Sequence, residues 1–98
     1  MKKLVRDNIP NIIKNKGESP KFHIANDKEY WSSLKEKLKE ETNEFIESES
    51  KEEFADILEV IEAISKFKKF NKKEIINIKE NKAKLKGKFK KGFILEHI

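Results

Sequence analysis

The sequence contains no cysteine, and its 98 residues include only three glycines and two prolines. The absence of cysteine excludes a disulfide-stapled fold, thiolate zinc sites and a cysteine nucleophile. No apolar run approaches the roughly 18 residues that a membrane helix needs, so we expect no membrane partner. Arg6, Asp7 and Pro10 interrupt any apolar core of a signal peptide, and we therefore expect a cytoplasmic protein.

Apolar residues are also scarce, at 36% of the chain against 42% charged residues. Ordinary soluble domains are about half apolar and a quarter charged. A chain of this size forms one small domain, here residues 1–98, and it can bury only a thin core by itself. We therefore expect elongated helices whose core is completed by oligomerisation, as a homodimer or a homotetramer.

The net charge of +5 is unevenly distributed. Residues 36–65 carry eleven acids and three lysines, whereas residues 66–91 carry twelve lysines and two acids. The first 35 residues are again basic, with eight lysines and arginines against four acids. A protein that only binds nucleic acid has no need of an acidic centre. A site that holds a cation together with a polyanion uses both kinds of segment.

The spacing of apolar residues predicts an all-α fold. After an N-terminal arm (residues 1–25) with a short helix near 10–15, we expect helices over 27–47, 51–69 and 72–86. Ser50 followed by Glu53 has the form of a capping box, which would begin the second long helix. The apolar tail, residues 88–98, could form a short extended pair with residues 3–5 of the arm.

Four carboxylates lie where the helical pattern calls for apolar or flanking residues. At 100° per residue, Glu41 lies about 20° from Leu34, inside the apolar stripe of its helix. Glu41 with Glu44, and Glu53 with Asp56, are i, i+3 pairs on two helices joined by a short turn, so the pairs can converge. A divalent cation would offset their repulsion, and all-oxygen ligands favour Mg²⁺, Mn²⁺ or Ca²⁺. Alternatively, Glu53 acts only as a capping residue and Glu44 is an exposed surface charge.

These residues also match a known motif. The sequence EETNE at 40–44 followed by EFAD at 53–56 resembles the EExxE…ExxD motif of the MazG-like all-α nucleoside triphosphate pyrophosphohydrolases. The opening KLVRDNIP at 3–10 is similar to the start of the phosphoribosyl-ATP pyrophosphohydrolase-like branch, and residues 55–60 and 87–89 fit the same branch. The resemblance implies a MazG-like helical bundle that cleaves a nucleotide between its α- and β-phosphates, with Mg²⁺ or Mn²⁺.

By the family pattern, the metal ligands are Glu41, Glu44, Glu53 and Asp56, and Glu44 and Glu41 are the candidate catalytic residues. Glu44 is the carboxylate that would accept the proton of a metal-bound water. Eight residues separate Glu44 from Glu53, fewer than is usual in the superfamily. Either this branch tolerates a tight turn, or the ligand set shifts toward Glu40 or Glu59.

The basic ends supply candidates for holding a triphosphate. Arg6 is the only arginine beside 22 lysines, and a guanidinium can bind phosphate through two parallel hydrogen bonds. Its alternative role is an ion pair with Asp7 or another nearby acid. Lys82 and Lys86 are further phosphate-binding candidates. Trp31 could stack on the base, although an aromatic residue at such a position more often packs against other side chains.

Two other functions compete with a pyrophosphohydrolase acting on a nucleoside triphosphate. One is a non-enzymatic basic helical module that binds nucleic acid or nucleotides through residues 66–91. Against nucleic acid as a partner stands the acidic centre, which would repel it in the absence of metal. The other is a protein of the same fold that binds nucleotides without turning them over. The sequence leaves the preferred base and sugar open.

Overall fold

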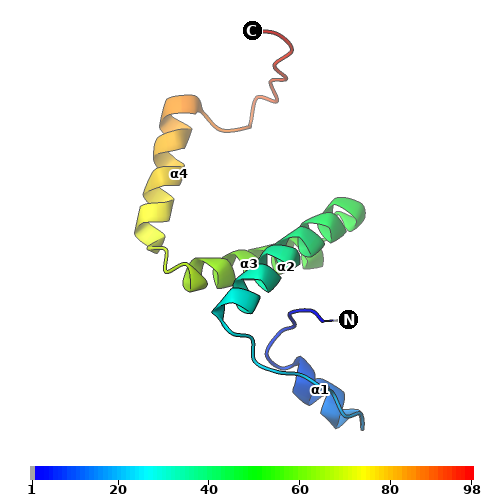
Figure 1. Cartoon of the computed structure of the whole chain (residues 1–98). Coiled ribbons are helices and arrows are strands. Elements are labelled where there is room, and N and C mark those ends of the chain that lie inside the picture. The colour runs from blue at the N-terminus through cyan, green and yellow to red at the C-terminus, as the bar shows by residue number, and fades with distance from the viewer. Residues whose placement is uncertain (1) are drawn as a thin grey trace. The chain divides into compact units, whose positions relative to one another are not determined.

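The computed structural model describes residues 2–98 and contains four helices in that part of the chain (Figure 1). They are α1 (Ile9–Asn15), α2 (Asp27–Ser48), α3 (Lys51–Phe67) and α4 (Lys72–Lys86). Each begins and ends within two residues of its expected range. The chain divides into two compact units, the first ending at Lys68 and the second running from Lys69 to Ile98. The all-α class is confirmed, whereas a single domain across residues 1–98 stays a prediction.

The helices begin where capping residues direct them to begin. Asn26, Ser50 and Asn71 precede α2, α3 and α4, and each side chain accepts a hydrogen bond from the backbone N–H three residues on, at 2.9, 3.2 and 3.0 Å. Each bond satisfies one of the backbone donors that a helix start leaves without a partner. Pro10 lies in the first turn of α1, where its missing N–H costs nothing.

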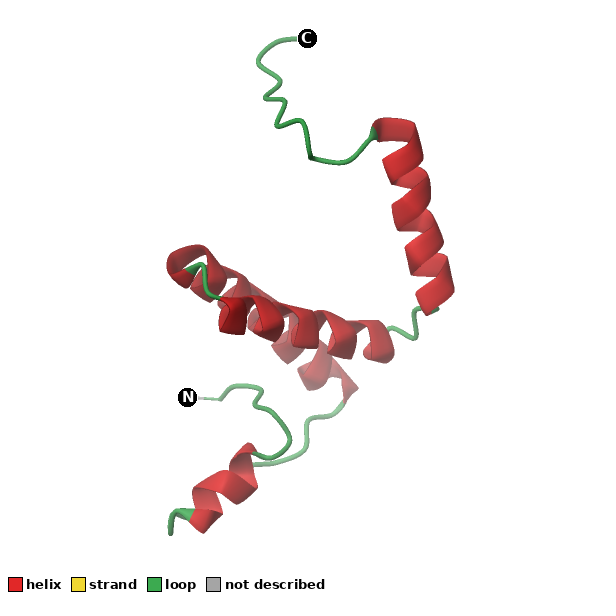
Figure 2. Cartoon of the chain, turned by 180° about the vertical axis from the view of Figure 1, so that it is seen from behind, coloured by secondary structure: helices red, strands yellow, loops and turns green. Residues whose placement is uncertain are grey.

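A two-residue connection joins α2 to α3. Glu49 ends α2 with a left-handed backbone (φ 54°), and its N–H donates to the Phe45 carbonyl at 2.7 Å. Ser50 then caps α3. A connection this short forces the chain to reverse, and the two helices lie side by side as an antiparallel hairpin (Figure 2).

Aromatic contacts at both ends fix the register of this hairpin. Near the turn, the rings of Phe45 and Phe54 lie 5.4 Å apart between centroids. At the open end, Trp31 stacks on Phe67 at 5.8 Å, and the Tyr30 ring meets Phe67 edge-on at 5.3 Å. Within each pair, the two residues lie at nearly the same number of residues from the turn along their own helices. The same register therefore places Glu41 and Glu44 of α2 opposite the first half of α3.

The hydrophobic core of the first unit is thin, as the composition predicts. Among the large apolar side chains of residues 2–98, Leu34 and Val60 are buried, with exposed fractions of 1% and 8%. Phe54, Leu58 and Ile61 are exposed, and their spacing places them on one face of α3. Phe54 contacts Phe45 of α2 at one end of this face, whereas Leu58 and Ile61 lie about 160° and 100° from Val60 and point away from α2. The hairpin leaves a second apolar surface in contact with solvent.

The expected extended pair between the arm and the tail is not formed, since residues 2–98 contain no strand. Side-chain ion pairs hold the arm instead. Lys3 Nζ lies 3.4 Å from a Glu40 carboxylate oxygen of α2, and Arg6 Nη2 lies 2.7 Å from Asp56 Oδ1 of α3. Ion pairs between side chains thus hold the arm against the hairpin, without backbone hydrogen bonds to a neighbouring strand.

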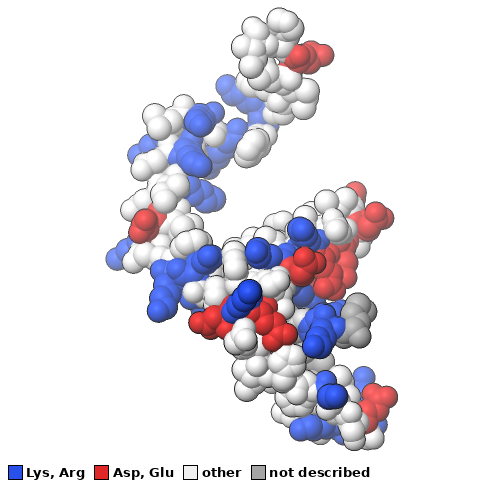
Figure 3. Space-filling model, in the orientation of Figure 1, with Lys and Arg blue, Asp and Glu red and all other residues white. Residues whose placement is uncertain are grey.

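The second unit consists of α4 and the tail. α4 ends at Lys86, followed by Gly87 at φ 85°, a conformation that glycine adopts without steric strain. Lysines dominate this unit, and Figure 3 shows them as blue surface over α4, while acidic side chains gather on the α2–α3 hairpin. None of the helices described in residues 2–98 combines the length and the apolar composition needed to cross a membrane.

Candidate metal centre

The α2–α3 hairpin brings carboxylates from both helices together. Glu41 of α2 forms a group with Glu53 and Asp56 of α3, in which one carboxylate oxygen from each residue lies within 4.8 Å of the others. On α3, Glu53 and Asp56 lie within about 40° of Val60, the side that packs against α2. A second group consists of Glu40, Glu41 and Glu44 on α2 alone. The four residues predicted as metal ligands therefore fall into two groups that share Glu41.

Glu41 is the most unusual member, because an ionisable side chain is 7% exposed. Its Oε2 atom and Oε2 of Glu53 are buried without a hydrogen-bond partner among the described residues. Burial, followed by the neighbouring carboxylates of Glu44 and Asp56, raises the pKa of Glu41. Lys37 opposes this shift from 3.5 Å but does not cancel it. A buried carboxylate with an unpaired oxygen costs free energy unless a cation or a proton joins it.

Lys37 and Lys3 partly offset the negative charge of the second carboxylate group by contacting Glu40. Lys37 Nζ lies 3.4 Å from a Glu40 carboxylate oxygen, and Lys3 contacts the other oxygen of the same group. Partial burial acts to raise the pKa of Glu40, but the two ammonium groups outweigh burial and the net pKa is lowered. Glu40 is therefore held as a carboxylate, while Glu41 is left with a deficit of positive charge.

Arg6 reaches the group from the N-terminal arm. Its Nη2 atom lies 2.7 Å from Asp56 Oδ1, and its Nη1 atom lies 3.9 Å from a Glu59 carboxylate oxygen. Glu59 thus contacts the guanidinium and belongs to neither carboxylate group. Of the two residues toward which the ligand set could shift, the structure brings Glu40 into a group and leaves Glu59 outside.

The donor set fits a hard divalent cation. Three carboxylates from two helices supply oxygen ligands at mutual separations that one ion can span, and two of their oxygens are buried without partners. Mg²⁺, Mn²⁺ and Ca²⁺ take oxygen ligands of this kind, whereas Zn²⁺ and Cu²⁺ favour nitrogen and sulfur. The chemical fit rests on Glu41, Glu53 and Asp56, with Glu44 exposed at the edge.

The other predicted site residues lie in different surroundings. Trp31 packs on Phe67, with Lys68 Nζ 4.2 Å from its ring centroid. It lies ten residues before Glu41 on α2, which corresponds to about 15 Å of helix rise. Lys82 and Lys86 belong to α4 in the second unit, and their role as phosphate ligands stays a prediction.

Sequence reasoning missed Lys37 as part of the acidic group. The signal was available, because Lys37 lies four residues before Glu41 and residues at i, i+4 are neighbours on a helix surface. A lysine on the same face as an out-of-place glutamate indicates a local counter-charge. Helix α2, which carries Glu41, therefore also supplies positive charge beside it, in addition to the N-terminal arm.

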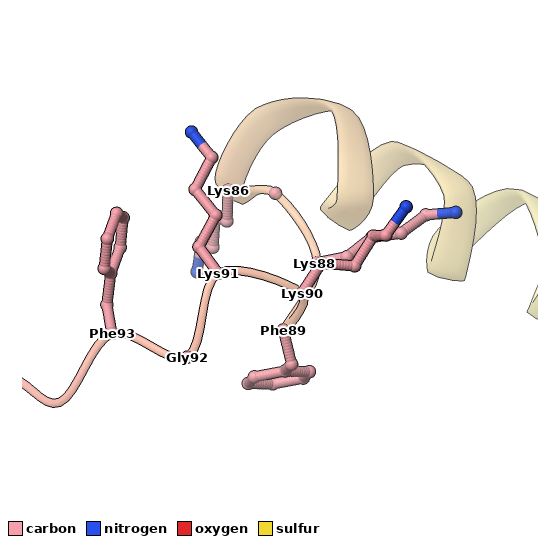
Figure 4. A pocket seen from close by; sticks show the side chains of 8 residues that line it. Lys86, Lys88, Phe89, Lys90, Lys91, Gly92 and Phe93 are labelled. Atoms are coloured by element: carbon pink, nitrogen blue, oxygen red, sulfur yellow. The ribbon is translucent and has the colours of Figure 1, made fainter.

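A separate hollow of about 430 Å³ lies in the second unit, where the chain turns after α4. Lysines and phenylalanines line it, and Figure 4 shows Lys88 and Lys90 extending together on one side, with the Phe93 ring on the other. Phe89 and Phe93 are exposed. No acidic residue lines this hollow, so its chemistry suits an anion and not a metal ion.

Comparison with known proteins gives one local likeness. No family model matches the chain, and no solved structure matches it. A protein of Mycolicibacterium smegmatis, described as uncharacterized, is 46% identical over 44 residues. These residues make up 45% of this chain and 45% of the relative, so the chain matches less than half of that protein's length.

Proposed function

We propose that the protein is a Mg²⁺-dependent nucleoside triphosphate pyrophosphohydrolase. The observation that carries the proposal is Glu41, a buried carboxylate with an unpaired oxygen, grouped with Glu53 and Asp56 of the facing helix. Such a group is unfavourable until a cation joins it, which is what a metal-dependent active site requires. The likeness of the EExxE…ExxD segment to the MazG-like motif adds the reaction class. The cytoplasmic nucleotide pool would supply the substrate.

In the proposed reaction, a nucleoside triphosphate and water give a monophosphate and pyrophosphate as the α–β anhydride bond breaks. Glu41, Glu53 and Asp56 would hold the cation. When bound, Mg²⁺ supplies charge neutralisation for the phosphate oxygens and a water of lowered pKa. Glu44 is exposed beside the group and would accept the proton of the attacking water. Arg6 would bind a phosphate oxygen pair through its guanidinium.

The test is a panel of NTPs and dNTPs incubated with the 98-residue chain and Mg²⁺. We expect pyrophosphate and the nucleoside monophosphate in equal amounts, and no release when EDTA removes the cation. Repeating the panel with Mn²⁺ covers the second cation that the ligands suit. A diphosphate with inorganic phosphate as products, or release that persists in EDTA, would contradict the proposal.

We further propose that a second copy of the chain covers the exposed face of α3. The free hairpin buries little apolar surface, while Phe54, Leu58 and Ile61 remain in solvent. Pairing two hairpins through this face would form a four-helix bundle and complete the core. The carboxylate group lies on a different side of α3, so dimerisation would leave it accessible.

We expect the wild type to sediment at twice the 11.6 kDa of the chain, or at a higher multiple. Leu58→Asp should shift the protein toward the monomer, because it places a charge in the centre of the apolar contact. Glu52→Lys, a charge change at an exposed position of the same helix that lies about 120° or more from Phe54, Leu58 and Ile61, is the control. A wild type that sediments as an 11.6-kDa monomer at micromolar concentration would refute the oligomer.

The second unit favours one other function, the binding of single-stranded nucleic acid. Its hollow combines lysines with the exposed rings of Phe89 and Phe93, and aromatic rings among basic residues are typical of surfaces on which bases stack. Affinity from phosphate neutralisation would fall steeply with salt. Binding of an oligonucleotide without Mg²⁺, weakened by Phe89→Ala and unaffected by Glu41→Gln, would favour this function over hydrolysis.

A further inference from the structure

Asp56 has two potential partners in the first unit. It belongs to the carboxylate group with Glu41 and Glu53, and one of its oxygens also accepts a hydrogen bond from Arg6 Nη2 at 2.7 Å. Arg6 is the only arginine in the chain. Its guanidinium therefore occupies the edge of the group that the proposed cation would fill.

A guanidinium and a divalent cation on the same carboxylate repel each other. Two positive unit charges a few ångströms apart repel each other by about 1 kcal/mol in water. The repulsion is larger where the protein excludes solvent. The Arg6 side chain is 59% exposed, so its bond to Asp56 is the weak kind of ion pair found at a surface. On the buried side of the group, Glu41 has Lys37 beside one oxygen, but its Oε2 atom has no hydrogen-bond partner to lose. The cation should therefore win the competition for Asp56.

The backbone of Arg6 lies in a local turn of the arm. Its carbonyl accepts a hydrogen bond from the N–H of Ile9 at 3.0 Å, at the turn that leads into α1. Lys3 holds the arm on the other side through Glu40. Release of the guanidinium from Asp56 thus needs rotation of one exposed side chain, while the ion pair of Lys3 with Glu40 still links the arm to α2.

We propose that Arg6 holds Asp56 in the metal-free protein and is released by the divalent cation to bind phosphate. Arg6 would then be a positioning residue that couples the two binding events, since the freed guanidinium lies beside the bound cation where the polyphosphate arrives. This inference rests on the proposed function. It adds an order of events: the cation binds first, and its binding frees the Arg6 guanidinium to bind the phosphate.

The test measures Mg²⁺ affinity by calorimetry on the 98-residue chain. Removal of the competitor with Arg6→Gln should tighten Mg²⁺ binding about fivefold, as expected when a surface ion pair no longer has to open. Lys2→Gln removes the same charge from the same arm at an exposed position. This control should change the affinity less than twofold, which separates direct competition from long-range charge effects.

A second readout follows the guanidinium itself. Because the chain has one arginine, the Nε–Hε resonance of Arg6 is assigned without ambiguity in an NMR spectrum. We expect this resonance to shift on addition of Mg²⁺, and to shift again when inorganic pyrophosphate is added. In Asp56→Asn, the resonance should already lie at its released position without Mg²⁺.

The outcomes separate the inference from the proposed function. If Mg²⁺ binding is lost in Glu41→Gln but Arg6→Gln binds no more tightly than the wild type, or if the resonance does not move, the inference is wrong and the metal centre stands. If neither the wild type nor Arg6→Gln binds Mg²⁺, or if binding survives Glu41→Gln, the proposed metal centre fails and the inference fails with it.

Discussion

Replacing Glu41 by Gln is expected to reduce Mg²⁺-dependent pyrophosphate release by at least about 100-fold. Loss of a residue that merely orients a metal ligand already costs 10- to 100-fold in metal affinity or activity, and a ligand should cost at least as much. Glu41 belongs to both carboxylate groups, so no other single substitution removes a ligand from each. The change keeps the shape of the side chain and removes its charge.

The control for this variant is Glu36→Gln, which changes the same residue type at an exposed position of α2. Glu36 lies about 160° from Leu34 and about 140° from Glu41 around the helix, away from the face that packs against α3. It should retain wild-type release. Initial rates at several Mg²⁺ concentrations show whether added cation rescues Glu41→Gln. Equal activity of Glu41→Gln and the wild type would remove Glu41 from the mechanism.

The sequence predicts the helices of this chain because local signals mark their ends. Ser50 makes the bond that the capping-box pattern predicts, to the N–H three residues on, and Asn26 and Asn71, residue types that favour this position, make the same bond. Apolar spacing between the caps gives the type of element. α3 ends two residues earlier than expected, since Lys69 adopts a left-handed backbone at φ 57° that no residue pattern signals.

The convergence of the carboxylates also follows from the sequence, because a short turn between two helices forces an antiparallel hairpin. The spacing of the acidic residues could not predict which carboxylate would be buried. That depends on the register set by Phe45 with Phe54 and by Trp31 with Phe67, which buries Glu41 and leaves Glu44 exposed.

The ion pair of Arg6 with Asp56 spans 50 positions of the chain. Sequence analysis gave Arg6 a nearby acid as an alternative partner but could not choose which one. Which exposed side chains form a long-range ion pair depends on how the N-terminal arm docks on the hairpin. That docking depends on the whole surface of the hairpin.

The same carboxylate should also control stability. In the folded protein, burial and the neighbouring carboxylates raise the pKa of Glu41, whereas in the unfolded chain it has an ordinary value near 4.5. Between these two values the folded state binds a proton that the unfolded chain does not, so stability falls as the pH rises through this window. Above the window the whole cost of the buried charge is present. Below pH 4.5 both states are protonated and the cost disappears.

Glu41→Gln should therefore be more stable than the wild type at pH 7. Relief of an unpaired buried group is worth about 1–3 kcal/mol, and a domain of this size gains about 4–8 °C in Tm per kcal/mol. We expect Tm to rise by about 5 °C or more, because the Gln amide can donate to the carboxylate oxygens of Glu53 and Asp56 nearby. The gain should shrink as the pH falls toward 4.5.

Addition of Mg²⁺ at pH 7 should make the Tm of the wild type higher than that of Glu41→Gln. The cation binds the folded wild type and raises its Tm by mass action, while Glu41→Gln has lost the ligand and gains little. Thermal melts of both proteins and of Glu36→Gln, at pH 7 and pH 4.5, with and without Mg²⁺, give the full comparison. A wild type more stable than Glu41→Gln at pH 7 without metal would mean that Glu41 contributes to the fold as a carboxylate. In that case its burial would be structural, and the free energy stored at this position would not be available for binding a cation.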